Sequence, residues 1–187
     1  MTIDQIFSEV SAHMIEGLMI HSQLSDYFNF LGLKGYAKCH KYHFFEESCN
    51  YKKLNWYYLT HYNKLVEENP FKNPGIIPEN WYQYTRQEVS IGTKKDALQE
   101  GFNKWIKWES ETKELYENMY KQLITLGEIA GAKILEQYII DVDNELAEAK
   151  QKHLELKAIG FDLSDIIQEQ DSEYKKYNKK LREIDLC

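Results

Sequence analysis

The prolines of this chain are confined to one segment, and that confinement limits the folds available to it. Pro70, Pro74 and Pro78 all lie within residues 67–93, in the stretch EENPFKNPGIIPENWYQYTRQEVSIGT. On either side, apolar residues recur with the period of a helix, and no stretch alternates convincingly as a strand does. The sequence therefore predicts an all-α fold that is divided by one proline-rich connection.

Interruptions in the helical pattern predict where each helix ends. The predicted helices cover residues 3–31, 36–66, 94–127, 128–158 and 165–184. The turns GLKG and AIGFDLS contain glycines of the kind that end helices, and Thr93 with Asp96 can cap the third helix. Short turns make the helices that they join antiparallel neighbours, whereas a connection of more than about 20 residues can cross the length of a bundle. We therefore predict a four-helix bundle with one long crossover and a short fifth helix.

The length and charge of the chain limit its domain organisation and its partners. The 187 residues suffice for one domain with a full core. We expect residues 1–158 to form the bundle, with its crossover at 67–93, and residues 159–187 to form a helical extension packed on or beside it. The net charge is -7 and no basic patch stands out, which argues against nucleic acid and anionic membranes as partners.

Three features predict a cytoplasmic protein. Cys39, Cys49 and Cys187 form no C-x-x-C pair and are odd in number, which argues against a disulfide framework and for a reducing compartment. The N-terminus carries Asp4 and Glu9 where a signal peptide has basic residues followed by an apolar run. Nowhere do 18 consecutive apolar residues occur, so we expect no membrane span.

A carboxylate interrupts the apolar face of the third predicted helix. Steps of four and three residues along FNKWIKWESETKELYENMY place Glu109 on one face with Trp105, Thr112 and Tyr116. Burying an unpaired carboxylate is costly, so Glu109 needs a partner from elsewhere in the chain. The same steps along the other long helices reach a metal-competent side chain near the middle of each, namely His21, Glu47 and Glu145.

Heights along the bundle indicate that these side chains meet in pairs. Glu109 lies 18 residues before Gly127 and Glu145 lies 18 residues after it, so the two carboxylates are level in an antiparallel hairpin. Around the turn between the first two helices, Glu47 and His21 are level within about one residue, or about 1.5 Å of helix rise. This count does not decide whether the two hairpins align with each other in height.

The chain resembles the ferritin-like superfamily, and in particular the small ferritin-like proteins encoded in phage and prophage genomes. The resemblance rests on HMIEGLMIH, FFEES, WESETKELY and DVDNEL, which come from the four long helices. Proteins of this family hold two irons with a Glu on each of two helices and Glu-x-x-His on each of the other two. Glu109-x6-Tyr116 matches the third helix of that pattern, and Glu47 and Glu145 match the glutamates of the second and fourth. The resemblance implies a ferritin-like fold with a metal site in its core.

The chain departs from the family pattern at the histidines. Asn50 and Glu148 stand three residues after Glu47 and Glu145, where the family has histidine, and His21 occupies the apolar face of the first helix. Nearby imidazoles and carboxylates can substitute for the missing ligands. The candidate metal ligands are therefore Glu47, Glu109, Glu145, His21, Glu16, Asp141 and His43.

Two functions stay open at this level. In the first, these carboxylates and imidazoles bind Fe or Mn, with two ions in one site, and the protein handles iron or acts as a ferroxidase or diiron oxidoreductase. In the second, a metal-free ferritin-like scaffold acts as an interaction or structural module, and the polar layer fixes helix register. We expect metal ions and further copies of the chain as partners. Cage-forming storage needs an assembly that the sequence does not reveal, and DNA protection is disfavoured by the acidic balance.

Overall fold

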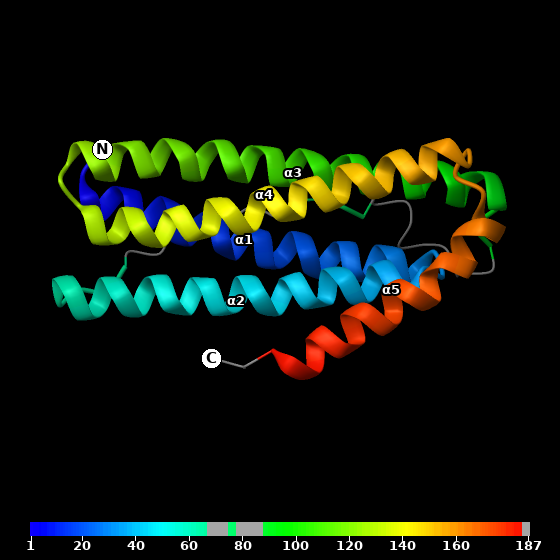
Figure 1. Ribbon diagram of the computed structural model, residues 1–187, viewed down its shortest axis with the longest axis horizontal. Coiled ribbons are helices and arrows are strands. Elements are labelled where there is room, and N and C mark those ends of the chain that lie inside the picture. Colours follow the sequence, from blue (N-terminus) through cyan, green and yellow to red (C-terminus); the bar gives the residue numbers. More distant parts are fainter. Residues whose placement is uncertain (67–74, 78–87, 185–187) are drawn as a thin grey trace.

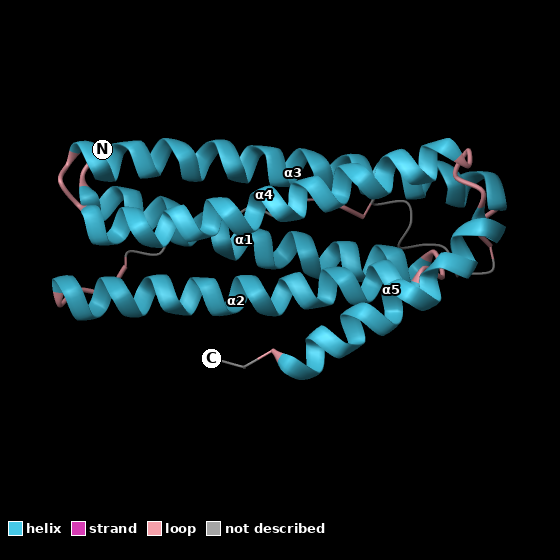
Figure 2. Ribbon diagram, in the orientation of Figure 1, coloured by secondary structure: helices cyan, strands magenta, loops and turns pink. Residues whose placement is uncertain are grey.

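The computed structural model describes residues 1–66, 75–77 and 88–184. Its described elements are the helices α1 (Ile3–Phe30), α2 (Lys34–Tyr62), α3 (Ile91–Thr125), α4 (Ile129–Ala158) and α5 (Leu163–Glu183). No strand occurs within these described ranges, as Figure 2 shows. The predicted all-α class is confirmed. Most of the predicted crossover at 67–93 lies outside the described residues.

Two helix boundaries differ from the predicted ones by three residues or more, and local hydrogen bonds and backbone angles give the reason. Asn63 adopts a left-handed conformation with φ of 53°, so α2 ends at Tyr62 and does not continue to residue 66. The cap of α3 is Ser90, whose Oγ accepts a hydrogen bond from the backbone N–H of Thr93 at 3.1 Å. The prediction that Thr93 and Asp96 cap this helix was therefore wrong, because both lie inside it.

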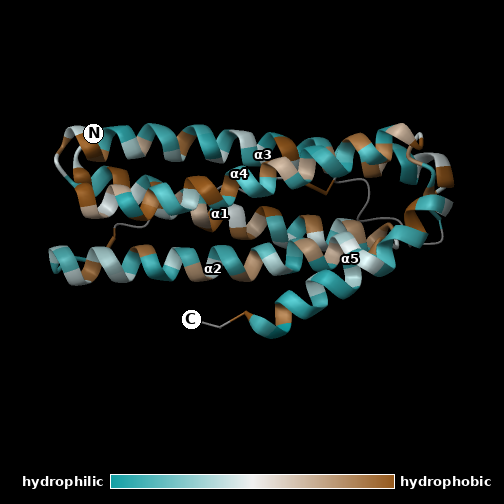
Figure 3. Ribbon diagram, viewed as in Figure 1, coloured by the Kyte–Doolittle hydropathy of each residue, from teal (hydrophilic) through white to brown (hydrophobic). Residues whose placement is uncertain are grey.

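The helices form two antiparallel hairpins that lie side by side (Figure 1). One hairpin is α1 with α2, the other is α3 with α4, and α1 also packs against α3. The last helix, α5, turns back at one end of the bundle and packs against α2. Hydrophobic and hydrophilic residues are interspersed along every helix, as expected for helices with one face toward a core (Figure 3).

The apolar core consists of two clusters, with a polar layer between them. The first cluster includes Phe28 and Trp108, and the second includes Phe7 and Tyr116. Along α3 the buried members of the first cluster end at Trp108 and those of the second begin at Tyr116. Glu109 lies in the interval and is only 2% exposed. The carboxylate that interrupts the apolar face of this helix is therefore buried, as the sequence predicted.

The predicted cytoplasmic location stays a prediction. Cys39 is a buried free thiol, but Cys49 is disulfide-bonded, so the odd cysteine count did not exclude a disulfide. Among the helices that the structure describes, none combines the length and the apolar character needed to cross a membrane.

Candidate metal centre

Histidines and glutamates from all four bundle helices meet in the polar layer. Potential ligand atoms of His21, Glu109 and Glu145 all lie within 4.8 Å of one another, and we call these residues the inner group. Atoms of His43, Glu46 and Glu145 meet the same criterion and form the outer group, in which the Glu46 side chain is 31% exposed. Glu145 of α4 belongs to both groups, so the two hairpins do align in height.

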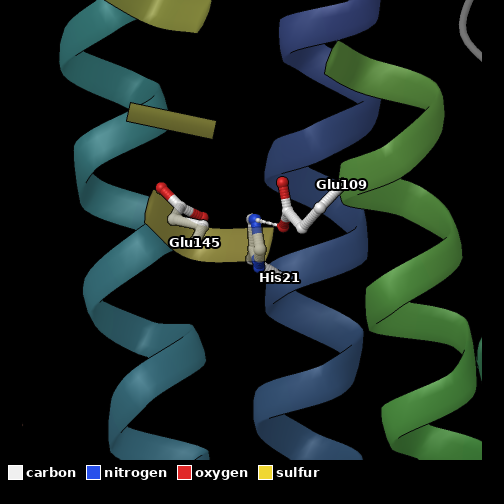
Figure 4. Close-up of side chains that lie close together, drawn as sticks. All are labelled: His21, Glu109 and Glu145. Carbon is white, nitrogen blue, oxygen red and sulfur yellow. Dashed lines mark ion pairs between the residues drawn. The ribbon is translucent and has the colours of Figure 1, made fainter. Parts of the chain in front are cut away.

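In the inner group, His21 lies between the carboxylates of Glu109 and Glu145 (Figure 4). Nε2 of His21 is 3.6 Å from Oε1 of Glu109, which is an ion-pair distance but too long for a hydrogen bond. The indole N–H of Trp105 donates to the same oxygen at 3.0 Å. Trp105 precedes Glu109 by four residues on α3, so the helix repeat itself holds this carboxylate in place.

In the outer group, one histidine nitrogen faces two carboxylates. Nδ1 of His43 lies 3.2 Å from Oε2 of Glu46 and 3.2 Å from Oε2 of Glu145. His43 and Glu46 are three residues apart on α2, a spacing that places both on one face of the helix. The phenol of Tyr42 donates to the other oxygen of Glu46 at 2.9 Å. Glu46 is thereby directed toward α4.

A glycine on α1 lies close to Trp108 and to the carboxylate of Glu47. A Cβ at Gly17 would lie 3.3 Å from Cζ2 of Trp108 and 3.8 Å from Cδ of Glu47. Glu47 is half-buried as a residue, yet its Oε2 is buried and has no hydrogen-bond partner among the described residues. One oxygen of the Glu47 carboxylate is therefore buried in the layer without a hydrogen-bond donor among the described residues.

Crowding of the carboxylates shows in their pKa values. Burial, and then the charge of Glu145, raise the pKa of Glu109 well above its ordinary value. The same two causes raise the pKa of Glu47 to about 8. Clustered carboxylates in apolar surroundings stay ionised only when cations neutralise them, and otherwise they take up protons. The layer therefore attracts positive charge.

The two ligand-type histidines differ in charge. Burial lowers the pKa of His21 well below its ordinary value, so this imidazole is neutral. For His43, burial also acts downward, but the charges of Glu145 and Cys39 and the hydrogen bonds to them together outweigh burial and raise the pKa well above its ordinary value. His43 is thus an imidazolium paired with Glu145, and a cation at the outer group would displace its proton.

The donor set suits a hard or intermediate transition metal. Carboxylate oxygens with one or two imidazoles are ligands for Fe or Mn, whereas thiolates would select softer ions. Nε2 of His21 and Oε2 of Glu47 are buried and have no hydrogen-bond partner among the described residues. These unpaired atoms point into a layer where the carboxylates repel one another. The residues present therefore fit a bound divalent cation.

Some of the predicted ligands meet and others do not. His21, His43, Glu109 and Glu145 lie in the two groups, and Glu47 is close enough to Glu145 for its pKa to respond to that charge. Glu16 is half-buried on α1 and belongs to neither group; five residues before His21, it lies about 7.5 Å away along the axis. Asp141 is half-buried, accepts a hydrogen bond from Gln137 Nε2 at 3.0 Å, and also belongs to neither group.

Two residues of the layer were not among the predicted ligands. Glu46 is the outer-group carboxylate, and its signal in the sequence is the i, i+3 spacing from His43. His40 is fully buried, and its Nδ1 lies 3.1 Å from Nδ1 of His21. Its place on the apolar face of α2 was visible in the sequence, but its partner on α1 was not.

Comparisons with known proteins identify the fold. No family model matches the chain, and no curated protein matches it in sequence. An engineered closed form of the Archaeoglobus fulgidus ferritin superposes with a TM-score of 0.73 at 14% identity, over 93% of this chain and 96% of that chain. The open pore ferritin of the same archaeon gives 0.72 at 15% identity, over 91% and 93%. A PmFTN variant soaked in iron gives 0.72 at 12% identity, over 90% and 96%. The fold is a ferritin-like helical bundle, as predicted.

Proposed function

We propose that the protein binds two iron or manganese ions in the polar layer, one at the inner group and one at the outer group. The observation that supports this most strongly is the position of Glu145, whose carboxylate belongs to both groups. A carboxylate shared between two sets of nitrogen and oxygen ligands is suited to two adjacent cations, as in ferritin-like dinuclear proteins.

The charges of the layer support two divalent ions. Glu46, Glu47, Glu109 and Glu145 carry four negative charges when ionised, and two divalent cations balance them. The inner ion would be held by Nε2 of His21 with Glu109, and the outer ion by Nδ1 of His43 with Glu46. Glu16 and Asp141 are not needed for this balance.

Iron bound here would supply the chemistry of Fe(II) oxidation by dioxygen or peroxide. The chain's own residues bind and orient the ion, and the two apolar clusters on either side exclude bulk water. Trp105 holds Glu109 through its indole N–H. Similarity to ferritins, one of them soaked in iron, is consistent with iron as the metal, although at 12–15% identity it establishes the fold alone.

One observation favours the second function, a metal-free scaffold. His43 pairs with Glu145 at 3.2 Å, and Trp105 donates to Glu109 at 3.0 Å, so part of the layer is satisfied internally. A polar layer of this kind can fix helix register without metal. A metal-free scaffold, however, gives no role to the two unpaired buried atoms, Oε2 of Glu47 and Nε2 of His21.

Elemental analysis of protein purified without chelator and loaded anaerobically with Fe(II) tests the proposal. We expect about two iron or manganese ions per chain, the number that a ferritin-like dinuclear site holds. Glu145→Gln should lose most of this metal, because both groups share that carboxylate. The matched control is Glu136→Gln, an exposed position on the same helix, which should retain it.

Absence of metal from the loaded wild-type protein, with an unchanged melting temperature after Fe(II) is added, would contradict the proposal and support the metal-free scaffold instead. A cation that binds only the folded state raises the melting temperature by mass action, so the two readings differ in this measurement as well. Homo-oligomerisation and the relation to phage and prophage proteins stay predictions, and light scattering on the purified protein decides the first of them.

A further inference from the structure

A second histidine lies directly behind the inner group. His40 of α2 is fully buried, and its Nδ1 is 3.1 Å from Nδ1 of His21. Its ring stacks on Phe28 with a centroid distance of 5.3 Å and an angle of 8°, and it meets Trp105 edge to face at 4.5 Å and 76°. Aromatic packing thus fixes the plane of the His40 ring. His40 has no potential ligand atom in either metal group.

The contact between the two Nδ1 atoms requires one proton and one lone pair. A hydrogen bond between ring nitrogens forms only when one donates and the other accepts. The distance of 3.1 Å fits such a bond, whereas Nε2 of His21 is 3.6 Å from Glu109 and makes no hydrogen bond within the described residues. The orientation of His21 is therefore set through Nδ1.

We propose that His40 is a positioning residue, which accepts the Nδ1 proton of His21 and so leaves Nε2 of His21 free to bind a cation. This inference rests on the proposed function. Ligand histidines usually donate their second N–H to a carboxylate, a backbone carbonyl or water. A neutral imidazole does the same without adding a further negative charge to a layer that already contains four carboxylates.

The position of the His21 proton is a direct readout of this role. Nitrogen NMR of protein with 15N-labelled histidine distinguishes the two tautomers and detects coupling across an N–H···N bond. In the metal-free protein we expect the proton on Nδ1 of His21 and a coupling to Nδ1 of His40. With Zn²⁺ as a diamagnetic probe, Nε2 should carry the metal and this coupling should persist. A proton on Nε2 of His21 in the metal-free protein would overturn the proposal.

Substitutions separate hydrogen bonding from packing. His40→Leu removes the acceptor at similar volume, and calorimetry should show Zn²⁺ affinity weakened by about 10- to 100-fold, the usual effect of losing such a partner. His40→Asn places Oδ1 close to the position of Nδ1, so it should retain most of the affinity. His153→Leu, a histidine outside both groups, is the matched control and should bind like wild type.

The outcomes that contradict the proposal are distinct from those that contradict metal binding. A folded His40→Leu protein with wild-type affinity would overturn it, and so would equal losses in the Leu and Asn variants, since packing alone would explain them. If wild type binds no cation, the proposed function fails, and the tautomer of metal-free His21 then decides the positioning role by itself. If the His40→Leu protein does not fold, the tautomer of His21 in the wild-type protein still tests the positioning role.

Discussion

Glu109 and Glu145 reach the same histidine from opposite arms of the α3–α4 hairpin (Figure 4). The turn between the arms contains Gly127, whose φ of 76° is a left-handed value that glycine adopts without strain. Because each carboxylate lies 18 residues from this glycine, both arrive at the level of His21 on α1. The buried carboxylates that meet here repel one another, and this repulsion makes the stability of the protein depend on pH.

The metal-free protein should lose stability as the pH rises from 6.5 to 8. The pKa of Glu47 is raised from 4.5 to about 8 by burial and by Glu145, so its folded form holds a proton that the unfolded chain has released. Stability from such a group is fully present below pH 4.5 and is lost as the pH rises through about 8. His43, whose pKa is raised well above 6.5, acts in the same direction. Urea midpoints measured at several pH values in the presence of chelator test this.

Between pH 6.5 and 8, the other buried histidines do not mask this loss of stability. Burial lowers the pKa of His21 and His40 well below 6.5 and that of His13 to about 4, so these groups reduce stability only as the pH falls below 6.5. Glu47→Gln should flatten the curve between pH 6.5 and 8. A curve that rises across this window in wild type would contradict the raised pKa of Glu47.

Tyr116→Phe should raise the free energy of unfolding of the metal-free protein by about 1 kcal/mol, since it removes a buried hydroxyl that lacks a partner. The phenol oxygen of Tyr116 is buried and has no hydrogen-bond partner among the described residues, and Glu47 is the charge that acts most strongly on it. The control is Tyr138→Phe, which loses a hydrogen bond of 3.0 Å to the carbonyl of Asn50 and should lower stability by about 1 kcal/mol. Equal losses in both variants would show that Tyr116 has a partner in solution.

The parts of this site that could be predicted are those that depend on the geometry of one hairpin. Helix rise is constant, so counting from Gly127 correctly places Glu109 and Glu145 at one level. Alignment of the two hairpins depends on packing between them, which no count along the chain contains. Side chains of adjacent residues point about 100° apart around the helix axis, so both Glu46 and Glu47 can reach the polar layer. The helical period by itself selected only Glu47.

The contribution of α5 was also beyond sequence reasoning, because it depends on contacts between distant residues. α2 begins after Leu33 without a side-chain cap of its own. Oε1 of Gln170 on α5 accepts the backbone N–H groups of Gly35 at 2.7 Å and Tyr36 at 3.2 Å. A helix start needs such acceptors, and here they come from a residue 135 positions away in the chain.

Gln170→Leu should lower the free energy of unfolding by about 1 to 2 kcal/mol, the upper range for loss of a helix cap. Gln170 is 6% exposed, so the two N–H groups that it leaves unpaired gain little from water. Gln168→Leu is the matched control, because Gln168 is exposed on the same helix, and its effect should stay within about 0.5 kcal/mol. Urea unfolding measures both, and equal effects would remove the capping role.

Lys152→Met, at the contact between α4 and α5, should lower stability more than the loss of a surface ion pair does. Nζ of Lys152 is 2.8 Å from Oε1 of Glu148 and also pairs with Glu173 of α5, and the lysine is only 9% exposed. Removing it takes the shared cation from Glu148 and Glu173, and Glu148 keeps Lys176 as a cationic partner at 2.9 Å, so the change should cost about 2 kcal/mol. The surface pair of Lys179 with Glu183 has side chains 77% and 63% exposed, so Lys179→Met should cost less than about 0.5 kcal/mol.

Acidification distinguishes this ion pair from simple packing by the lysine stem. Burial alone would raise the pKa of Glu148, but its interactions with Lys152 above all, and then its hydrogen bonds from Tyr177 and Lys176, lower it to about 2. The stability that comes from this group is therefore present above pH 4.5 and is lost as the pH falls toward 2. The difference between wild type and Lys152→Met should shrink over the same interval. A difference that stays constant down to pH 2 would mean that Lys152 stabilises the contact through its methylene groups.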